Sequence, residues 1–292
     1  MGSSQKAILQ TLLYSDIFSF PLTKDEITTF LISDTLISSN LLSESLRKMS
    51  SHFTYSKNYY AFKGREKIIK KRILLINESE KKIKFAKKIV RLLSFIPTIN
   101  LIGVSGGLAV GDVDKGDDID LFIITSKDSL WLTRLCILSI LELKGIRRKR
   151  LGKKVSNTFC VNMMIEENAL ELDIDRRDLY TAKEVVQMLP MFERGSTYKL
   201  FLRQNKWVTN FLPNAILVKK QIVVPIRKKR NKILRKSILS QFNKIARKIQ
   251  IGRIMRNKTT EIISDKLVAF HPKDYRKQIL NEFEERLKEF SL

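Results

Sequence analysis

The stretch from Ile102 to Thr125 constrains this chain more than any other part of it. It reads IGVSGGLAVGDVDKGDDIDLFIIT: an apolar run, a glycine pair, a polar loop, and two aspartates at the head of a second apolar run. Side chains alternate between the two faces of a β-strand, so Asp118 and Asp120 are predicted to point the same way. Ile119 and Leu121 then face the core.

The residue types in this stretch indicate a particular chemistry. Two carboxylates about one strand repeat apart can share hard divalent cations such as Mg²⁺. The glycine pair Gly106-Gly107 leaves backbone N–H groups open to a phosphate, because no side chain shields them. Carboxylates for a metal and amides for a phosphate are the two halves of a metal-dependent phosphoryl-transfer site. The sequence holds no Walker loop, zinc-ligand spacing or Ser-His-Asp arrangement, which argues against those classes.

The charge of the chain favours polyanionic partners. Fifty-five basic residues against thirty acidic ones give the 292-residue chain a net charge of +25. That excess favours nucleic acid or an anionic membrane surface and raises the rate of association with either. The alternative is a lysine-rich composition without functional meaning. The length allows more than one domain with its own core.

The cysteines and the N-terminus favour a cytoplasmic protein. Only two cysteines occur, Cys136 and Cys160, and both lie inside apolar stretches. We interpret them as small buried hydrophobes, not as a disulfide framework or a metal knuckle. The first residues lack the apolar core of a signal peptide, and no run reaches the roughly 18 apolar residues of a membrane span.

Residues 1–64 have the pattern of a small helical domain with a hairpin. Thr23 and Glu26 are spaced as a capping box at the start of the second of three predicted helices. The aromatic runs 53–55 and 59–62 predict two short antiparallel strands. Three helices followed by such a wing resemble a winged helix-turn-helix domain, whose third helix enters the major groove of DNA. DNA contact and a structural or protein-docking role both remain open.

The rest of the chain divides into three further predicted parts. Residues 65–97 form one long, strongly basic helix that links the first domain to the glycine-aspartate stretch. Residues 98–215 alternate strands and helices, which predicts a small α/β domain with a mixed sheet, including strands near 158–165 and 169–174. Residues 216–292 are predicted to be a basic helical region.

The C-terminal region contains a long basic amphipathic segment. Residues 219–260 include no acidic side chain, and their apolar residues recur at near-helical spacing. Such a helix could follow phosphates, lie on anionic lipid, or pack on the α/β domain with a cationic outer face. The sequence leaves these three interpretations open.

Gly106-Gly107, ten residues, and then Asp118-Ile119-Asp120-Leu121 resemble the signature of the polymerase-β-like nucleotidyltransferase superfamily. That signature is a glycine pair or Gly-Ser after a hydrophobe, a short spacer, and aspartates alternating with hydrophobes. The whole chain also resembles uncharacterised bacterial nucleotidyltransferase-domain proteins. The resemblance implies an α/β (α+β) nucleotidyltransferase fold with a mixed sheet, preceded here by the winged-helix-like domain and followed by the helical C-terminal region.

The resemblance also implies roles for individual residues. Asp118 and Asp120 would be the catalytic residues and would bind Mg²⁺, or Mn²⁺, ions that bridge the phosphates of an NTP. The phosphates would be held by Ser105, Gly106, Gly107 and Lys115.

A third metal ligand is less clear. The family usually supplies a third carboxylate from a later strand, and on Phe159–Ile165 the matching polar position is Asn162. An asparagine can bind a cation through its carbonyl oxygen but cannot act as a base. Glu171 or Asp173 could substitute if 169–174 form the relevant strand.

The function implied is transfer of a nucleoside monophosphate from an NTP to a hydroxyl acceptor, with release of pyrophosphate. The acceptor could be nucleic acid, a protein side chain or a small molecule. The alternative is a DNA-binding regulator with a degenerate, non-catalytic nucleotidyltransferase domain. The sequence leaves open the acceptor, the preferred base, the oligomeric state and whether the site is active.

Overall fold

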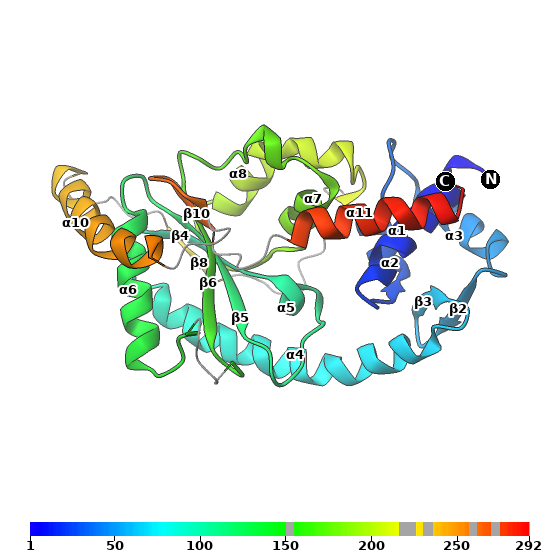
Figure 1. Cartoon of the computed structure of the whole chain (residues 1–292), viewed down its shortest axis with the longest axis horizontal. Helices are drawn as coiled ribbons and strands as arrows, with labels where there is room; N and C mark the ends of the chain where they lie inside the picture. Colours follow the sequence, from blue (N-terminus) through cyan, green and yellow to red (C-terminus); the bar gives the residue numbers. More distant parts are fainter. Residues whose placement is uncertain (150–154, 216–225, 230–235, 257–261, 270–274, 292) are drawn as a thin grey trace.

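The computed structural model of this chain is a mixed α/β protein built on two sheets (Figure 1). The structure describes residues 1–149, 155–215, 226–229, 236–256, 262–269 and 275–291. Among them, one sheet has three strands in the order β1-β3-β2 and the other has seven in the order β8-β7-β4-β5-β6-β10-β9.

The N-terminal unit contains the three-stranded sheet. Its elements are α1 (Ser3–Ile17), β1 (Leu22–Thr23), α2 (Lys24–Thr29), α3 (Ser39–Lys48), β2 (Phe53–Ser56) and β3 (Tyr59–Phe62). The predicted capping box is confirmed: the Glu26 backbone N–H donates to the Thr23 hydroxyl, and the Thr23 backbone N–H donates to the Glu26 carboxylate. The predicted hairpin is also confirmed, and it turns at Lys57 and Asn58, which both have positive φ.

Helix α4 (Glu66–Leu93) connects the N-terminal unit to the large sheet, as the basic pattern predicted. It runs along one side of the molecule in Figure 1, contacting β3 near its start and β7 further along. Its buried positions include Ile69, Ala86 and Val90, at helical spacing. Charged residues fill most of its remaining surface.

The large sheet is mixed, as predicted. Its strands are β4 (Ile99–Ser105), β5 (Ile119–Thr125), β6 (Phe159–Glu166), β7 (Leu189–Arg194), β8 (Ile226–Lys228), β9 (Ile262–Ile263) and β10 (Leu267–Ala269). Strand β5 lies at its centre, antiparallel to β4 and parallel to β6. Both faces of β5 are covered, so its residues from Leu121 onward are apolar up to Thr125.

Helices cover the two faces of the sheet. On one face α4 and α6 (Leu130–Leu143) pack over Ile119, Leu121 and Ile123, and α10 (Lys236–Met255) packs against α6. On the other face α7 (Leu179–Gln187) and α8 (Thr197–Gln204) pack over Phe122 and Ile124. The alternation predicted for the aspartate strand is therefore present.

One sequence-based prediction about the later elements is wrong. Residues 169–174 do not form a strand; they are loop and the start of the short 3₁₀ helix η1 (Ile174–Arg176). Pro190 lies within β7, at an irregularity in the pairing of β7 with β4, where a missing N–H is tolerated.

Two short helices follow β7: α8 and the 3₁₀ helix η2 (Lys206–Asn210). Asn205 separates them: its side-chain amide donates to the Leu170 and Phe201 carbonyl oxygens and accepts from the Leu172 N–H. This side chain therefore replaces backbone pairing at the break.

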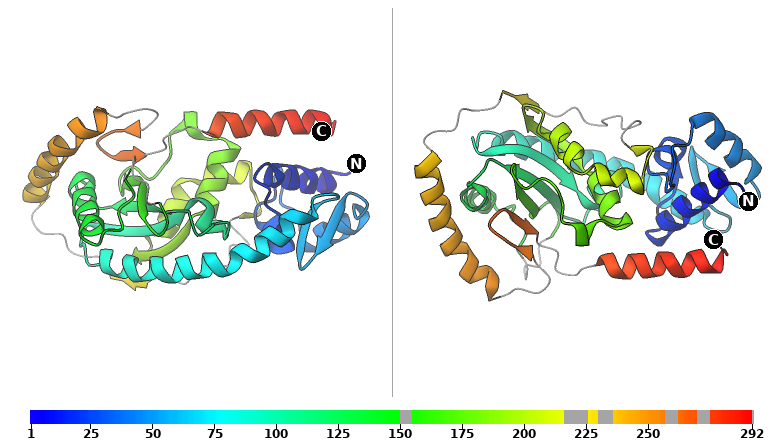
Figure 2. Two further views of the ribbon diagram at one scale, coloured as in Figure 1. Left: turned by 60° about the horizontal axis from the view of Figure 1, so that its bottom comes forward. Right: turned by 90° about the horizontal axis from the view of Figure 1, so that it is seen from above.

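The C-terminal region is not purely helical. Strands β8, β9 and β10 extend both edges of the large sheet. Helix α11 (Tyr275–Glu289) returns to the N-terminal unit, where Arg286 bonds Asp16 at 2.8 Å and Phe283 meets Tyr14 edge to face. Both views in Figure 2 show α11 beside the N-terminal unit and α10 at the opposite end of the molecule. Among the described residues, no helix has the length and apolar character that crossing a bilayer requires.

Candidate active site

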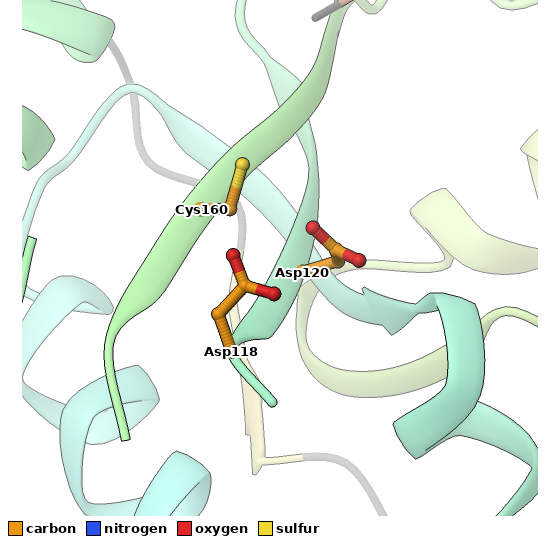
Figure 3. A group of neighbouring side chains, drawn as sticks. All are labelled: Asp118, Asp120 and Cys160. Carbon is orange, nitrogen blue, oxygen red and sulfur yellow. The ribbon is translucent and has the colours of Figure 1, made fainter. Parts of the chain in front are cut away.

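Asp118, Asp120 and Cys160 lie together at the start of β5 and β6. One potential ligand atom from each of the three, two carboxylate oxygens and the thiol sulfur, lies within 4.8 Å of the other two. Figure 3 shows both carboxylates on the same side of β5, with Cys160 on the neighbouring strand. We call this group the Asp-Asp-Cys cluster.

Strand register places these side chains. Asp120 is opposite Ser105 of β4 and Cys160 of β6, so these three residues form a row across three strands on one face of the sheet. This is the face that α7 and α8 cover further along β5. Asp118 precedes the first residue of the strand and lies one repeat away from Asp120.

Burial raises the pKa of both carboxylates in the cluster and so opposes their simultaneous ionisation. Burial, followed by repulsion from Asp118 and Glu184, raises the pKa of Asp120 to about 7. Burial also raises the pKa of Asp118, while the nearby Arg148 opposes that rise. Adjacent carboxylates with raised pKa values are typical of sites that gain a cation.

The charges of the two aspartates also act on Cys160, the third member of the cluster. Burial and the carboxylates of Asp120 and Asp118 raise the pKa of the Cys160 thiol, so the metal-free protein keeps it protonated at neutral pH. Arg148 supplies the neighbouring positive charge, with its Nε 3.3 Å from Asp118 Oδ2. Arg148 therefore partly balances the negative charge of the carboxylates in the cluster.

The glycine pair lies directly beside Asp120. Gly106 has φ +65°, and a Cβ at this position would stand 2.9 Å from Asp120 Oδ2. A Cβ on Gly107 would stand 2.4 Å from the Asp112 carbonyl oxygen, so this position also excludes a side chain. The pair opens the short helix α5 (Gly106–Val110), directly after Ser105. Ser105 Oγ is buried and has no hydrogen-bond partner among the described residues.

A buried lysine holds the loop before Asp118. Lys82 of α4 is only 1% exposed, and its ammonium group donates to the Lys115 and Asp117 carbonyl oxygens. The Lys115 side chain itself is exposed. Lys115, the candidate phosphate-binding lysine, thus lies on the loop that Lys82 anchors, and it is close to the cluster in sequence.

The strand register bears on the third metal ligand expected at Asn162. The residue opposite Asp120 is Cys160, whereas Asn162 falls at an irregularity of β6, between the partners of Leu121 and Phe122. Asn162 is the extra residue of this bulge and has no partner on β5, so the strand register pairs it with neither aspartate.

The other two candidates for the third ligand have different surroundings. Glu171 forms an ion pair with Arg177 at 2.6 Å, and Asp173 precedes η1. Neither belongs to the cluster found among the described residues.

Sequence reasoning missed Cys160, Arg148, Lys82 and Glu184. Cys160 was interpreted as a buried hydrophobe, yet pairing β6 with β5 residue by residue would have placed it beside Asp120. Glu184 comes from α7, and burial raises its pKa to about 7. No local sequence pattern marks Glu184 or Lys82, because both reach the site from elements that pack there only in three dimensions.

No family model, curated protein or solved structure matches this chain. The function proposed next therefore rests on the residues of this chain.

Proposed function

We propose that this chain has a nucleotidyltransferase fold and transfers a nucleoside monophosphate from an NTP to a hydroxyl acceptor, releasing pyrophosphate. The observation that carries the proposal is the packing of Gly106 against Asp120, where the absent Cβ would lie 2.9 Å from Oδ2. It brings a turn open to phosphate next to paired carboxylates, the combination that such a reaction needs.

The donor set fits a divalent cation. Mg²⁺ is usually bound by one or two carboxylates together with substrate phosphates, and Asp118 and Asp120 supply that number. Ser105 Oγ, which has no hydrogen-bond partner in the described part of the chain, provides a further oxygen on the same face. A Mg²⁺ or Mn²⁺ ion bound there would neutralise phosphate charge and make the α-phosphorus more electrophilic.

The remaining residues position the nucleotide. The backbone amides at Gly106 and Gly107 would hold the β- and γ-phosphates, and the exposed Lys115 would add a positive charge on the adjoining loop. Arg148, now paired with Asp118 at 3.3 Å, is close enough to exchange that carboxylate for a phosphate oxygen when the nucleotide arrives.

The test is transfer of label from each α-labelled NTP, with Mg²⁺ or Mn²⁺, to RNA, lysate protein and a small-molecule extract. Asp118→Asn/Asp120→Asn is the matched variant, because amides keep the shape and remove the charge. Label that appears with the wild type alone supports the proposal and identifies the acceptor class. Equal labelling by the double variant contradicts it.

One observation favours the second candidate, a nucleic-acid-binding regulator. A cavity of about 380 Å³ lies between α2, α3 and the hairpin, and Lys24, Arg47, Tyr55 and Tyr60 are among its lining residues. The two tyrosine rings lie 4.6 Å apart. Cations beside aromatic faces are common where nucleic acid binds.

This candidate predicts salt-dependent binding of DNA without nucleotide or metal. Arg47→Ala should weaken that binding, and Lys87→Ala, exposed on α4 outside this domain, is the control. Sequence-preferring DNA binding by a protein that labels no acceptor would favour the regulator over the enzyme.

A further inference from the structure

Helix α10 is attached to the protein by one face. Ala246 is buried at the centre of that face. Asn243 accepts a hydrogen bond from the Leu132 N–H, and Gln250 donates to the Trp131 carbonyl oxygen. These residues recur at helical spacing and fix α10 against the first half of α6.

A second stripe on α10 is apolar and exposed. It consists of Ile238, Phe242, Ile245 and Ile249, which are 48%, 54%, 55% and 62% exposed. Spacings of four, three and four residues put the four side chains on one side of the helix. Four large apolar side chains left in water along one helix are unusual for a protein surface and indicate an interaction site.

The charges beside this apolar stripe are positive. Lys244 and Lys248 are exposed on the same helix, and Arg256 follows its last turn. The segment 219–260 contains no acidic residue. Arg247, by contrast, is partly neutralised by Asp265 at 2.7 Å. The partner of this surface should therefore be both apolar and negatively charged.

Two other kinds of partner fit these features less well. A second copy of the chain, docked stripe to stripe, would bring the α10 lysines of two molecules of charge +25 together. Nucleic acid would neutralise the lysines but would leave three isoleucines of the apolar stripe without an apolar partner.

The interface of an anionic bilayer satisfies both requirements. Its acyl boundary accepts the apolar stripe, and its headgroups accept the lysines, whose long side chains reach outward from a partly inserted helix. Figures 1 and 2 show α10 at one end of the molecule, away from both termini. A flat surface can therefore approach it without meeting the N-terminal unit.

We propose that α10 docks this protein reversibly on anionic lipid, with Ile238, Phe242, Ile245 and Ile249 entering the interface and Lys244 and Lys248 contacting the headgroups. The docking is peripheral and independent of the nucleotidyltransferase proposal, since it involves neither the Asp-Asp-Cys cluster nor the glycine turn.

The test is co-sedimentation of the full chain with vesicles of phosphatidylcholine alone or with about a third phosphatidylglycerol. We expect binding to the anionic vesicles and little to the neutral ones. Phe242→Ser/Ile245→Ser should lower the partition coefficient about tenfold or more. Leu74→Ser, at another exposed apolar residue, is the control and should bind as the wild type does.

The contribution of charge has its own comparison. Lys244→Gln/Lys248→Gln should lower the partition coefficient on the order of thirtyfold at low salt. Lys84→Gln/Lys88→Gln, exposed on α4 at the same spacing, should change it far less. Circular dichroism and melting check each variant, and Ile238→Ser/Ile249→Ser replaces the first apolar pair if that pair misfolds.

Three results would overturn the proposal. The first is equal binding to neutral and anionic vesicles, and the second is no binding to either. The third is wild-type binding by folded variants of the apolar stripe, which would mean that the basic surface alone attracts polyanions. The Asp118→Asn/Asp120→Asn variant should bind vesicles normally, so failure of the enzymatic proposal would not affect this outcome.

Discussion

The ammonium group of Lys82 lies 2.7 Å from the backbone carbonyl oxygen of Asp117, one residue before the first aspartate of the cluster. The same ammonium also reaches the Lys115 carbonyl oxygen at 3.3 Å. A long helix on one face of the sheet therefore holds the loop that delivers Asp118 to the other face. Because the acceptors are backbone atoms, this contact depends on the position of the loop and not on its side chains.

Replacing Lys82 should loosen this loop. Lys82→Met keeps most of the side-chain length but leaves two carbonyl oxygens without their donor, so we expect a loss of about 1–3 kcal/mol in the free energy of unfolding. We also expect weaker Mn²⁺ binding, measured by calorimetry. Lys84→Met, exposed on the same helix, is the control. Unchanged stability and metal affinity in Lys82→Met would show that the loop holds itself.

Gly106 and Gly111 allow steric contact and backbone strain to be separated. Both have positive φ, but a Cβ at Gly106 would press on Asp120, whereas a Cβ at Gly111 would meet nothing within 4 Å. Each alanine variant should lose about 1–2 kcal/mol through left-handed strain. Only Gly106→Ala should also reduce label transfer or Mn²⁺ affinity, by about tenfold. Equal functional losses in the two variants would indicate strain alone.

Cys160 predicts an unusual metal preference. A thiol beside two carboxylates favours softer cations than a site of oxygen ligands alone, so the wild type should bind Mn²⁺ more tightly than Mg²⁺. Cys160→Asp should narrow this difference by strengthening Mg²⁺ binding, and Cys160→Ser is the neutral control. Calorimetric titrations with each metal check this expectation. If Cys160→Asp leaves the Mn²⁺/Mg²⁺ ratio unchanged, the thiol does not contribute to metal binding.

Lys183 predicts a pH-dependent stability. Burial lowers its pKa to about 7, although its ammonium group donates to the Phe30 carbonyl oxygen at 3.1 Å and lies over the Tyr14 ring. In the unfolded chain the pKa of lysine is near 10.4, so between about pH 7 and pH 10 the unfolded state binds more protons than the folded state. The free energy of unfolding should therefore rise with pH across this window.

The matching variant is Lys183→Met, in which this contribution to the slope disappears. Urea denaturation at several pH values between 6 and 10 compares the two proteins, with the variant gaining most over the wild type at the acidic end. Parallel curves for the two proteins would contradict a depressed Lys183 pKa.

The sequence by itself determined what depends on neighbouring residues along the chain. Alternation along β5 put Ile119 in the core and both aspartates on one face, and the Thr23–Glu26 spacing started α2 with its capping box. These features follow from backbone geometry and contacts a few residues apart, so a local pattern can specify them. Gly106 and Asp120 both belong to the stretch 102–125, and their close approach in the folded protein arises within that one stretch.

Only the tertiary structure decided what joins distant segments. The pairing of Asp120 with Cys160, and the bulge at Asn162 two residues later, belong to the register of β6 against β5 and not to either strand alone. Strands β9 and β10 are two and three residues long, too short for a periodic signal; β10 forms on the edge of β6, which offers unpaired backbone groups, and β9 pairs with β10. Lys82 contacts Asp117 only because α4 packs under the sheet. Hydrogen bonds and apolar contacts between distant segments depend on the folded arrangement, and no local sequence pattern specifies them.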